Sequence, residues 1–507
     1  RGRCRCQGHG HAASFMSAML ARPQPQCSGR LVVASHARPG RVHRQAAMDG
    51  PDLDALFGAE PQPQTSPPTA VTPTACTSAE PESPARPHPA LLLAVGNLLS
   101  ETWPRAAKEL RAAPADRPAE LCAELAGRLD AAASAAGERR WADCAQAAEV
   151  VRCAAWERLF AGSGWQRNCE RELFMLAELL LGLSAEARGD AASAITRADS
   201  TFVFAAAGGF RDAALLFVRW LDGEAREQRQ KSASKLPASA AFGSAPRWMR
   251  PAWPAGGLAL ARWHAPNREK LHDLIRAREP FVVSGALADW PARERWASLA
   301  ELDAAIGHRI VPVEVGSKVG SSGWREELMP LWCFLSAYLA PSCEYCSHWL
   351  EPRESYDSGV AYLAQHELLE QCPTLRSDVA LPDDWRKVLG KPSRTNVWLG
   401  THGTVTPCHF DSYDNFLTQV QGTKRAILLS PKERSRLYVD ASASGTSKQG
   451  NVSQVDVESP DLERFPEFAK AQCLVAELAP GDALFIPQGW WHQVRALAPS
   501  FSVNFWF

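Results

Sequence analysis

The chain has 507 residues, enough for two or three domains of ordinary size, and 46% of them are hydrophobic. Lysine and arginine total 55 against 56 acidic residues, a net charge of -1, which argues against a protein that coats nucleic acid through bulk positive charge. No apolar run approaches the roughly 20 residues of a bilayer span. We therefore expect neither direct nucleic-acid binding nor a membrane span.

Residues 1–88 form a leader that we expect to be disordered. Residues 1–47 contain several arginines and no acidic residue, which is the composition of an organelle transit peptide. The alternative is untranslated sequence read through, with the true start at Met48. From 60 to 89 the sequence is dominated by proline, serine and threonine, which cannot bury a core.

Residues 89–230 are rich in alanine, leucine, glutamate and arginine, with apolar residues at helical spacing, as in ERELFMLAELLLGL. Glycines at 162, 164, 189 and 208–209 divide this stretch, so we predict several helices stacked as antiparallel pairs. Two roles fit such a helical domain. It is either a platform for partner proteins or a cap packed on the next domain.

The pattern changes after a linker at residues 231–249. Short apolar runs punctuated by proline and glycine follow, and several of them alternate apolar and polar residues at period two. This pattern predicts a closed or sandwiched antiparallel sheet. Two helical segments, REKLHDLIRA and SLAELDAAI, precede the main run of strands.

The strongest local signal is TVTPCHFDSYDNF, in which His409 and Asp411 are two residues apart. Such residues project from one face of a strand and supply two ligands for a divalent ion. His492 in PGDALFIPQGWWHQV is the third candidate, and we expect its strand to face the first one across the mouth of a jelly roll. Two histidines and one carboxylate form the facial triad of non-haem iron(II) oxygenases.

The spacing of glycine and proline residues before His492 supports these three metal-ligand candidates. Gly481, Pro487, Gly489 and His492 have the G-x5-P-x-G-x2-H spacing of the second cupin motif. Cupins usually carry a fourth ligand, and three ligands leave adjacent positions for a bidentate 2-oxo acid. Lys424, fifteen residues after His409, is placed to hold the far carboxylate of such an acid, or else is a solvated hairpin residue.

These motifs, with YLAQHELLEQ, HRIVPVEVGS, NFLTQVQGTK and SFSVNFW, closely resemble the Jumonji-C domain of the cupin superfamily, the iron(II)- and 2-oxoglutarate-dependent oxygenases. The resemblance covers about residues 250–507 and extends more loosely into the helical half. It implies an α+β multidomain protein, with an N-terminal helical domain and a C-terminal double-stranded β-helix (jelly roll). Iron(II) is then the metal, with 2-oxoglutarate and dioxygen as cosubstrates.

The resemblance also implies roles for individual residues. The iron ligands are His409, Asp411 and His492; the residues around 2-oxoglutarate are Lys424, Tyr362, Thr406 and Asn415; the substrate-pocket wall contains Glu314, Gln365, Trp398 and Trp506. A carboxylate at Glu314 suits a guanidinium or ammonium group, although an exposed strand residue is the alternative. Trp398 and Trp506 fit the barrel core equally well.

Several functions are compatible with such a site. The preferred hypothesis is hydroxylation of arginine in a protein or peptide substrate, and lysine N-methyl demethylation is the alternative. A non-catalytic reader or adaptor is the rival from another class. The peptidase activity attributed to the family lacks support, because no H-E-x-x-H motif occurs. The resemblance alone suggests chromatin-associated partners for the helical domain, and a nuclear or cytoplasmic location unless the leader redirects the protein.

Residues 342–358 look like an insertion before the YLAQ segment. They contain Cys343, Cys346 and His348, a C-x2-C-x-H cluster. One such pair without a second makes a poor zinc site, so we predict a surface loop with free thiols, with a structural metal site as the alternative.

Overall fold

The computed structural model describes residues 32–33, 87–111, 119–159, 168–205, 208–231, 236–243, 251–252, 256–285, 287–316, 324–340, 359–439 and 451–507. The insertion at 342–358, with Cys343, Cys346 and His348, lies outside the described residues, as does most of the leader. Within the leader, the backbone of Val32 and Val33 pairs with strand β6. The disorder predicted for the leader stays a prediction.

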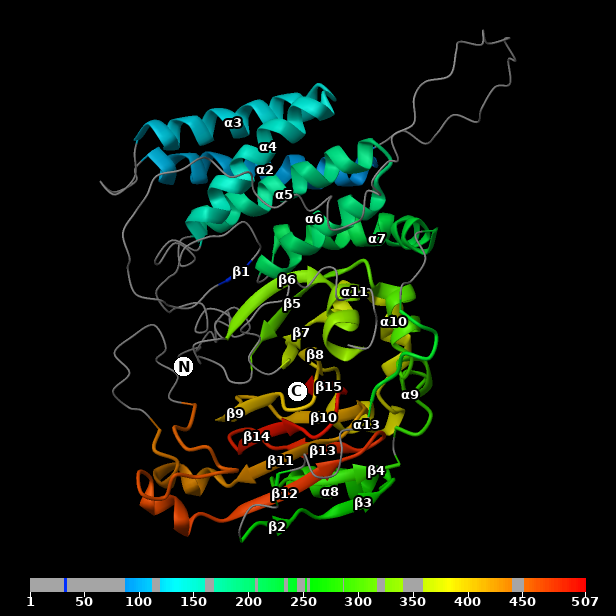
Figure 1. Cartoon of the computed structure of the whole chain (residues 1–507), viewed down its shortest axis with the longest axis vertical. Coiled ribbons are helices and arrows are strands. Elements are labelled where there is room, and N and C mark those ends of the chain that lie inside the picture. The colour runs from blue at the N-terminus through cyan, green and yellow to red at the C-terminus, as the bar shows by residue number, and fades with distance from the viewer. Residues whose placement is uncertain are drawn as a thin grey trace, which may run out of the picture.

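Six helices make up the N-terminal part of the described chain (Figure 1). They are α2 (Pro89–Arg111), α3 (Ala119–Gly137), α4 (Trp141–Leu159), α5 (Asn168–Ala187), α6 (Ala191–Phe204) and α7 (Gly209–Lys231). Helix α5 is central, because Leu173, Leu176, Leu180 and Leu183 are all buried against its neighbours. Two of the predicted breaks fall between helices, at Gly189 and Gly208, which both have the positive φ that glycine adopts without steric cost, whereas the break at 162–164 lies outside the described residues.

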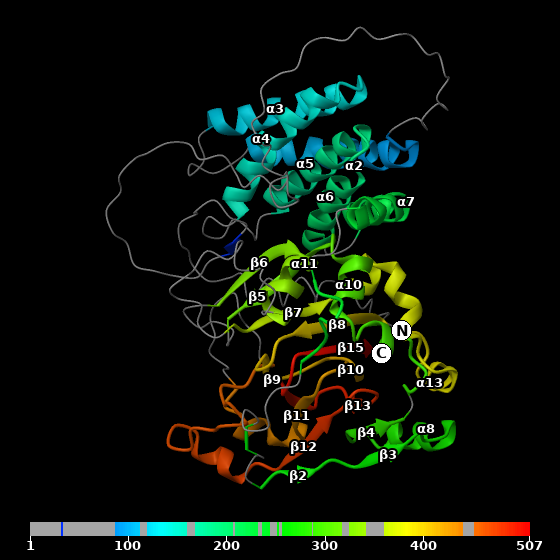
Figure 2. The same cartoon turned by 45° about the vertical axis from the view of Figure 1, so that its right-hand side comes forward.

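The C-terminal part contains two sheets with short helices around them (Figure 2). The larger sheet has the strand order β1-β6-β5-β7-β8-β15-β10-β13-β4-β3, and the smaller has the order β2-β12-β11-β14-β9. Their strands are β1 (Val32–Val33), β2 (Leu258–Ala259), β3 (Arg262–His264), β4 (Phe281–Ser284), β5 (Ile310–Val315), β6 (Arg325–Pro330), β7 (Ala361–His366), β8 (Arg394–Gly400), β9 (Val405–Phe410), β10 (Asn415–Gln421), β11 (Lys424–Leu429), β12 (Cys473–Leu478), β13 (Ala483–Ile486), β14 (Trp491–Ala496) and β15 (Ser500–Trp506).

The two sheets pack face to face as a jelly roll. Apolar side chains from both meet in one cluster, with Leu417 and Leu484 from the larger sheet and Leu428 and Val494 from the smaller. Strands far apart in the sequence are hydrogen-bonded neighbours, such as β10 with β15 and β11 with β14. The two helices predicted from REKLHDLIRA and SLAELDAAI are present as α8 (Arg268–Arg276) and α10 (Leu299–Ile306).

The helical part lies against the outer strands of the larger sheet, with α6 in contact with β5 and α7 in contact with α10 (Figure 1). The other short α-helices are α9 (Ala292–Arg295), α11 (Leu331–Phe334), α12 (Leu368–Gln371) and α13 (Asp383–Leu389). Across the described ranges, no helix has both the length and the hydropathy that crossing a membrane requires.

Candidate metal centre

Two histidines lie side by side on neighbouring strands of the smaller sheet. His409 of β9 and His492 of β14 are directly paired in the antiparallel register, and their ring centroids are 4.3 Å apart. The expectation that these strands face each other across the barrel mouth is wrong. The jelly-roll strand order makes β9 and β14 adjacent, so backbone pairing itself sets the spacing of the two imidazoles.

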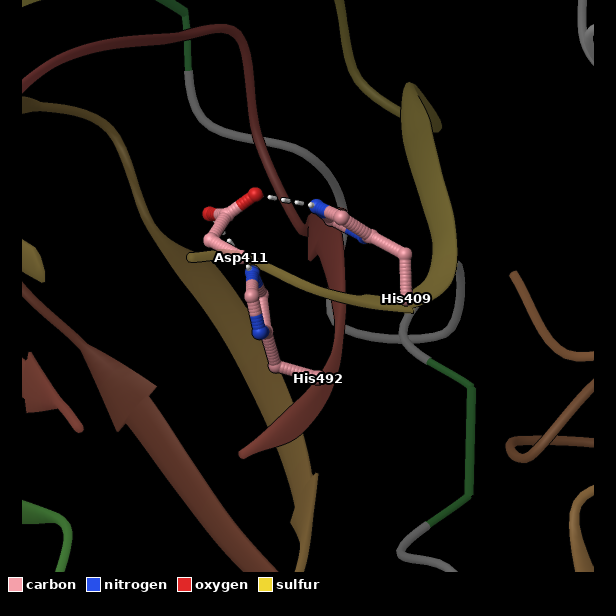
Figure 3. Close-up of side chains that lie close together, drawn as sticks. All are labelled: His409, Asp411 and His492. Carbon is pink, nitrogen blue, oxygen red and sulfur yellow. Dashed lines mark ion pairs between the residues drawn. The ribbon is translucent and has the colours of Figure 1, made fainter. Parts of the chain in front are cut away.

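Asp411 completes the cluster from the turn that follows β9. Its Oδ1 lies 3.6 Å from His409 Nε2, and its Oδ2 lies 3.7 Å from His492 Nε2. Figure 3 shows the three side chains pointing toward one another. One ligand atom from each residue lies within 4.8 Å of the others, so a single divalent ion can contact all three.

Backbone carbonyls orient both imidazoles. His409 Nδ1 lies 2.8 Å from the carbonyl oxygen of Pro407, and His492 Nδ1 lies 3.1 Å from that of Trp490. With the Nδ1–H donating to these carbonyls, each Nε2 keeps a free lone pair on the side of Asp411. The sequence therefore supplies both the ligands and the groups that select the metal-binding tautomer.

Burial keeps His492 in its neutral form. Loss of water around the ring, followed in importance by the nearby His409, lowers the pKa of His492 to about 4. Only neutral imidazole binds a metal, so this ligand stays available well below the ordinary histidine pKa. On the opposite face of the strand, Cys408 is buried in an apolar cluster, as the alternation of side chains requires.

A pocket extends from the three ligands into the barrel. All the site residues predicted from the sequence, except Glu314, line it together with four further residues. The lining residues are Tyr362, Gln365, Trp398, Thr406, His409, Asp411, Asn415, Leu417, Lys424, Ile486, His492, Val494, Asn504 and Trp506.

Lys424 is the cation of this pocket. It is the first residue of β11, its side chain is almost fully buried, and its Nζ donates a hydrogen bond of 3.3 Å to the Tyr362 hydroxyl. No carboxylate forms an ion pair with it in the part of the chain that the structure describes. Burial lowers the pKa of Lys424 to about 7. An unpaired ammonium in such a place is costly unless an anion joins it.

Residues 266–507 match the family model described as a cupin-like domain. The cluster of His409, Asp411 and His492 agrees with this match. The C-terminal half is a cupin-like domain, and we call it the JmjC domain because the relatives that it is similar to include proteins named for that domain.

Relatives of the JmjC domain occur in widely separated organisms. The Xenopus tropicalis protein "Lysine-specific demethylase 8" is 38% identical over 49% of this chain and 53% of its own length. The Arabidopsis thaliana protein "Lysine-specific demethylase JMJ30" is 35% identical over 47% and 52%. The Dictyostelium discoideum "JmjC domain-containing protein F" is 28% identical, but over 69% of this chain and 85% of its own length. Several curated relatives, including the first two, are matched over only about half their length.

Glu314 lies outside the JmjC pocket. It stands on β5, opposite Tyr362 of β7 on one side and opposite Glu326 of β6 on the other. Strand β5 lies next to β7 on the side away from β8, so Glu314 lies beside the pocket wall and not in it. Burial and then the neighbouring Glu326 raise the pKa of Glu314 to about 8, and burial raises that of Glu326 to about 7.

Four lining residues were missed in the sequence, and one of them has a clear polar role. Asn504 accepts a hydrogen bond from Trp398 Nε1 at 2.8 Å and donates one to Asn415 Oδ1 at 3.1 Å. The signal for most of the missed residues was strand periodicity. Asn504 precedes Trp506 by two positions, Leu417 follows Asn415 by two, and Val494 follows His492 by two, so each shares a face with a predicted residue.

The JmjC residues fit the groups that this domain implies. Two imidazole Nε2 atoms and one carboxylate on the same side are the donor set of non-haem iron(II), and softer thiolate ligands are not part of it. Lys424 is buried and has no ion-pair partner among the described residues, so it suits the carboxylate of a 2-oxo acid.

Proposed function

We propose that the chain is an iron(II)- and 2-oxoglutarate-dependent protein hydroxylase that acts on arginine side chains. One observation carries the oxygenase part of the proposal: a three-ligand cluster shares a pocket with a buried lysine that has no acidic partner among the described residues. A metal site alone serves many functions. A metal site next to an anion site for a chelating acid points to this cosubstrate chemistry.

His409, Asp411 and His492 would hold the iron, and Lys424 with Tyr362 would hold the distal carboxylate of 2-oxoglutarate. Iron(II), when bound, supplies the activation of dioxygen that couples decarboxylation of 2-oxoglutarate, to succinate and carbon dioxide, with insertion of one oxygen atom into a substrate C–H bond. The protein's own task is to fix the ligands and the acid and to keep water out. Trp398, Asn504 and Asn415 contribute a hydrogen-bonded wall to that end.

An acidic row beside the pocket favours an arginine substrate. Glu326, Glu314 and Tyr362 follow one another across β6, β5 and β7, and the structure gives no basic side chain paired with either carboxyl group in its described part. A guanidinium group that extends past Tyr362 would bring several N–H donors in one plane to these acceptors, whereas a trimethylammonium group brings none.

Lysine demethylation is the second candidate, and the names of the relatives favour it. The same oxidation at an N-methyl carbon would release formaldehyde and leave a demethylated lysine. The reader or adaptor hypothesis is disfavoured because the complete donor set and Lys424 are retained. A chromatin-associated partner of the helical domain and a nuclear or cytoplasmic location stay predictions.

The first experiment measures succinate formed from 2-oxoglutarate by the full-length chain with iron(II) and dioxygen. His409→Ala should abolish the activity, and His272→Ala, which changes an exposed histidine, should leave it intact. Equal succinate formation by His409→Ala and the unaltered protein would refute the oxygenase proposal. Mass analysis of incubated peptides then separates the two outcomes, because hydroxylation adds one oxygen atom and demethylation removes a methylene unit.

A further inference from the structure

The helical domain holds the start of strand β5 through a fully buried arginine. Arg309 donates through Nε and Nη2 to the two carboxylate oxygens of Asp199 on α6, at 2.9 and 2.6 Å, and through Nη1 to Asp222 on α7 at 3.1 Å. Asp199 Oδ2 also accepts the backbone N–H of Ile310 at 2.9 Å. One carboxylate thus binds the side chain before β5 and the first amide of β5, which sets where that strand begins.

From β5 the contacts lead to the end of β7. The Ile310 carbonyl accepts a hydrogen bond of 2.7 Å from Gln371 Nε2, and Gln371 Oε1 lies 2.6 Å from His366 Nε2. Burial lowers the pKa of His366 to about 4, so its ring is neutral and donates to that amide oxygen. His366 is therefore tied to the same strand start that the helical domain holds.

The helical domain also contacts the end of β7 directly. Phe202 of α6 meets the His366 ring edge-on, with centroids 6.1 Å apart. Arg211 of α7 lies over the Phe202 ring, 3.9 Å from its centroid, and forms an ion pair of 2.8 Å with Glu367. Two consecutive residues, His366 and Glu367, are thus held by the two helices nearest to the barrel.

The residue before them is strained. Gln365 has φ of +48°, and the pairing register of β7 with β8 shifts between Leu363 and His366, which marks a bulge. Bulges redirect side chains, and a non-glycine residue keeps positive φ only where its surroundings impose it. Gln365 lines the pocket of the metal centre. The next two residues in the chain, His366 and Glu367, make the contacts that hold Gln365 in this conformation.

We infer that helices α6 and α7 position the wall of the substrate pocket. Phe202 and Arg211 hold His366 and Glu367 so that the bulge keeps Gln365 in the pocket, which makes Arg211 a positioning residue. The helical domain therefore helps to shape the pocket and is not structurally independent of the JmjC domain. The assignment of the pocket to substrate rests on the proposed function, but the coupling between α7 and the bulge does not.

A double-mutant cycle in the full-length chain tests this coupling. Arg211→Ala should raise the amide hydrogen-exchange rate of residues 361–371 by about tenfold, because the bulge loses its support. Gln365→Gly should raise the thermal midpoint by about 2–4 °C, because glycine adopts positive φ without strain. In the Gln365→Gly background, Arg211→Ala should change exchange far less, since a relaxed bulge no longer needs the clamp.

Arg229→Ala is the matched control. Arg229 lies on the same helix and also crosses to the barrel side, through Asp303 and the Trp332 ring, but it does not contact β7. This variant should leave exchange at 361–371 unchanged in both backgrounds. Additive effects of Arg211→Ala and Gln365→Gly, or unaltered exchange in Arg211→Ala, would overturn the inference. Coupled exchange in a protein that forms no succinate would support it and refute only the oxygenase proposal.

Discussion

At the scale of single residues, the buried Lys424 lowers the stability of the fold. Its ammonium group is almost fully buried, it donates a hydrogen bond to the Tyr362 hydroxyl, and burial lowers its pKa to about 7. In the unfolded chain the pKa is near 10.4, so the unfolded state binds more protons between about pH 7 and 10. Stability therefore rises with pH across that window because of this residue.

We expect Lys424→Met to separate the two properties. Removing the buried charge should raise the free energy of unfolding by about 1–2 kcal/mol at neutral pH and remove the pH slope above 7, both measurable by denaturant titration. The same change should weaken 2-oxoglutarate binding by about 2 kcal/mol or more, roughly thirtyfold, as measured by calorimetry. A variant that is less stable and still binds the acid normally would contradict a cosubstrate role for Lys424.

Glu314 makes a pH-dependent prediction for the substrate. With its pKa raised to about 8, the Glu314 carboxyl group is mostly protonated at neutral pH, and the charge of a guanidinium group bound in the adjacent pocket would favour the ionised form without direct contact. The affinity for an arginine peptide, at saturating 2-oxoglutarate, should therefore rise with pH up to about 8 and then level off. Glu314→Gln should flatten the profile. Glu326→Gln should shift the rise to lower pH, because Glu326 contributes to the raised pKa of Glu314.

At the scale of elements, adjacent strands place the pocket residues, and small residues give them room. Gly400 ends β8 directly opposite Tyr362 of β7. A Cβ at Gly400 would lie 2.6 Å from Tyr362 Cδ2 and 3.0 Å from the Ala361 carbonyl oxygen. The tyrosine that contacts Lys424 therefore occupies space that only glycine leaves open.

Gly400→Ala should consequently displace Tyr362. We expect a loss of about 1–3 kcal/mol in the free energy of unfolding, together with weaker 2-oxoglutarate binding, measured by chemical denaturation and calorimetry. Gly96→Ala in α2 is the control, because a Cβ there meets nothing within 4 Å, and it should be neutral or slightly stabilising. Normal cosubstrate affinity in Gly400→Ala would show that Tyr362 does not take part in binding.

At the scale of the whole molecule, buried ion pairs join the helical domain to the JmjC domain. Arg309 and Asp199 are both fully buried, and Asp222 adds a second carboxylate from α7. Of the two roles considered for the helical domain, the cap is therefore present in the structure. The face formed by α6 and α7 is occupied by the barrel.

Asp199→Asn should leave the Arg309 charge incompletely neutralised in the interior. We expect a loss of about 3–5 kcal/mol in the free energy of unfolding, seen in denaturant melts of the full-length chain. Asp383→Asn removes an exposed ion pair with Arg386 and should leave the midpoint unchanged. If both variants melted alike, the interface between the domains would not depend on this network.

The H-x-D…H cluster, the place of Lys424 in the pocket and the fold class could be predicted from local patterns together with the family resemblance. The H-x-D spacing brings His409, on β9, and Asp411, in the turn after β9, to the same site, and the glycine and proline spacing before His492 marks the turn that leads into β14. Period-two alternation would also have indicated Asn504, Leu417 and Val494. None of these predictions depends on which strands are neighbours in the sheet.

What the sequence by itself determined is the set of chemical groups: the three ligands, the lysine and the alternation that turns them inward. Only the tertiary structure decided that β9 and β14 are adjacent, that Glu314 stands behind Tyr362, and that α6 and α7 support the strained Gln365. The physical reason is that these features depend on strand order and on packing between distant segments. Backbone pairing and buried charges fix these spatial relations, and the periodicity of a single segment does not encode them.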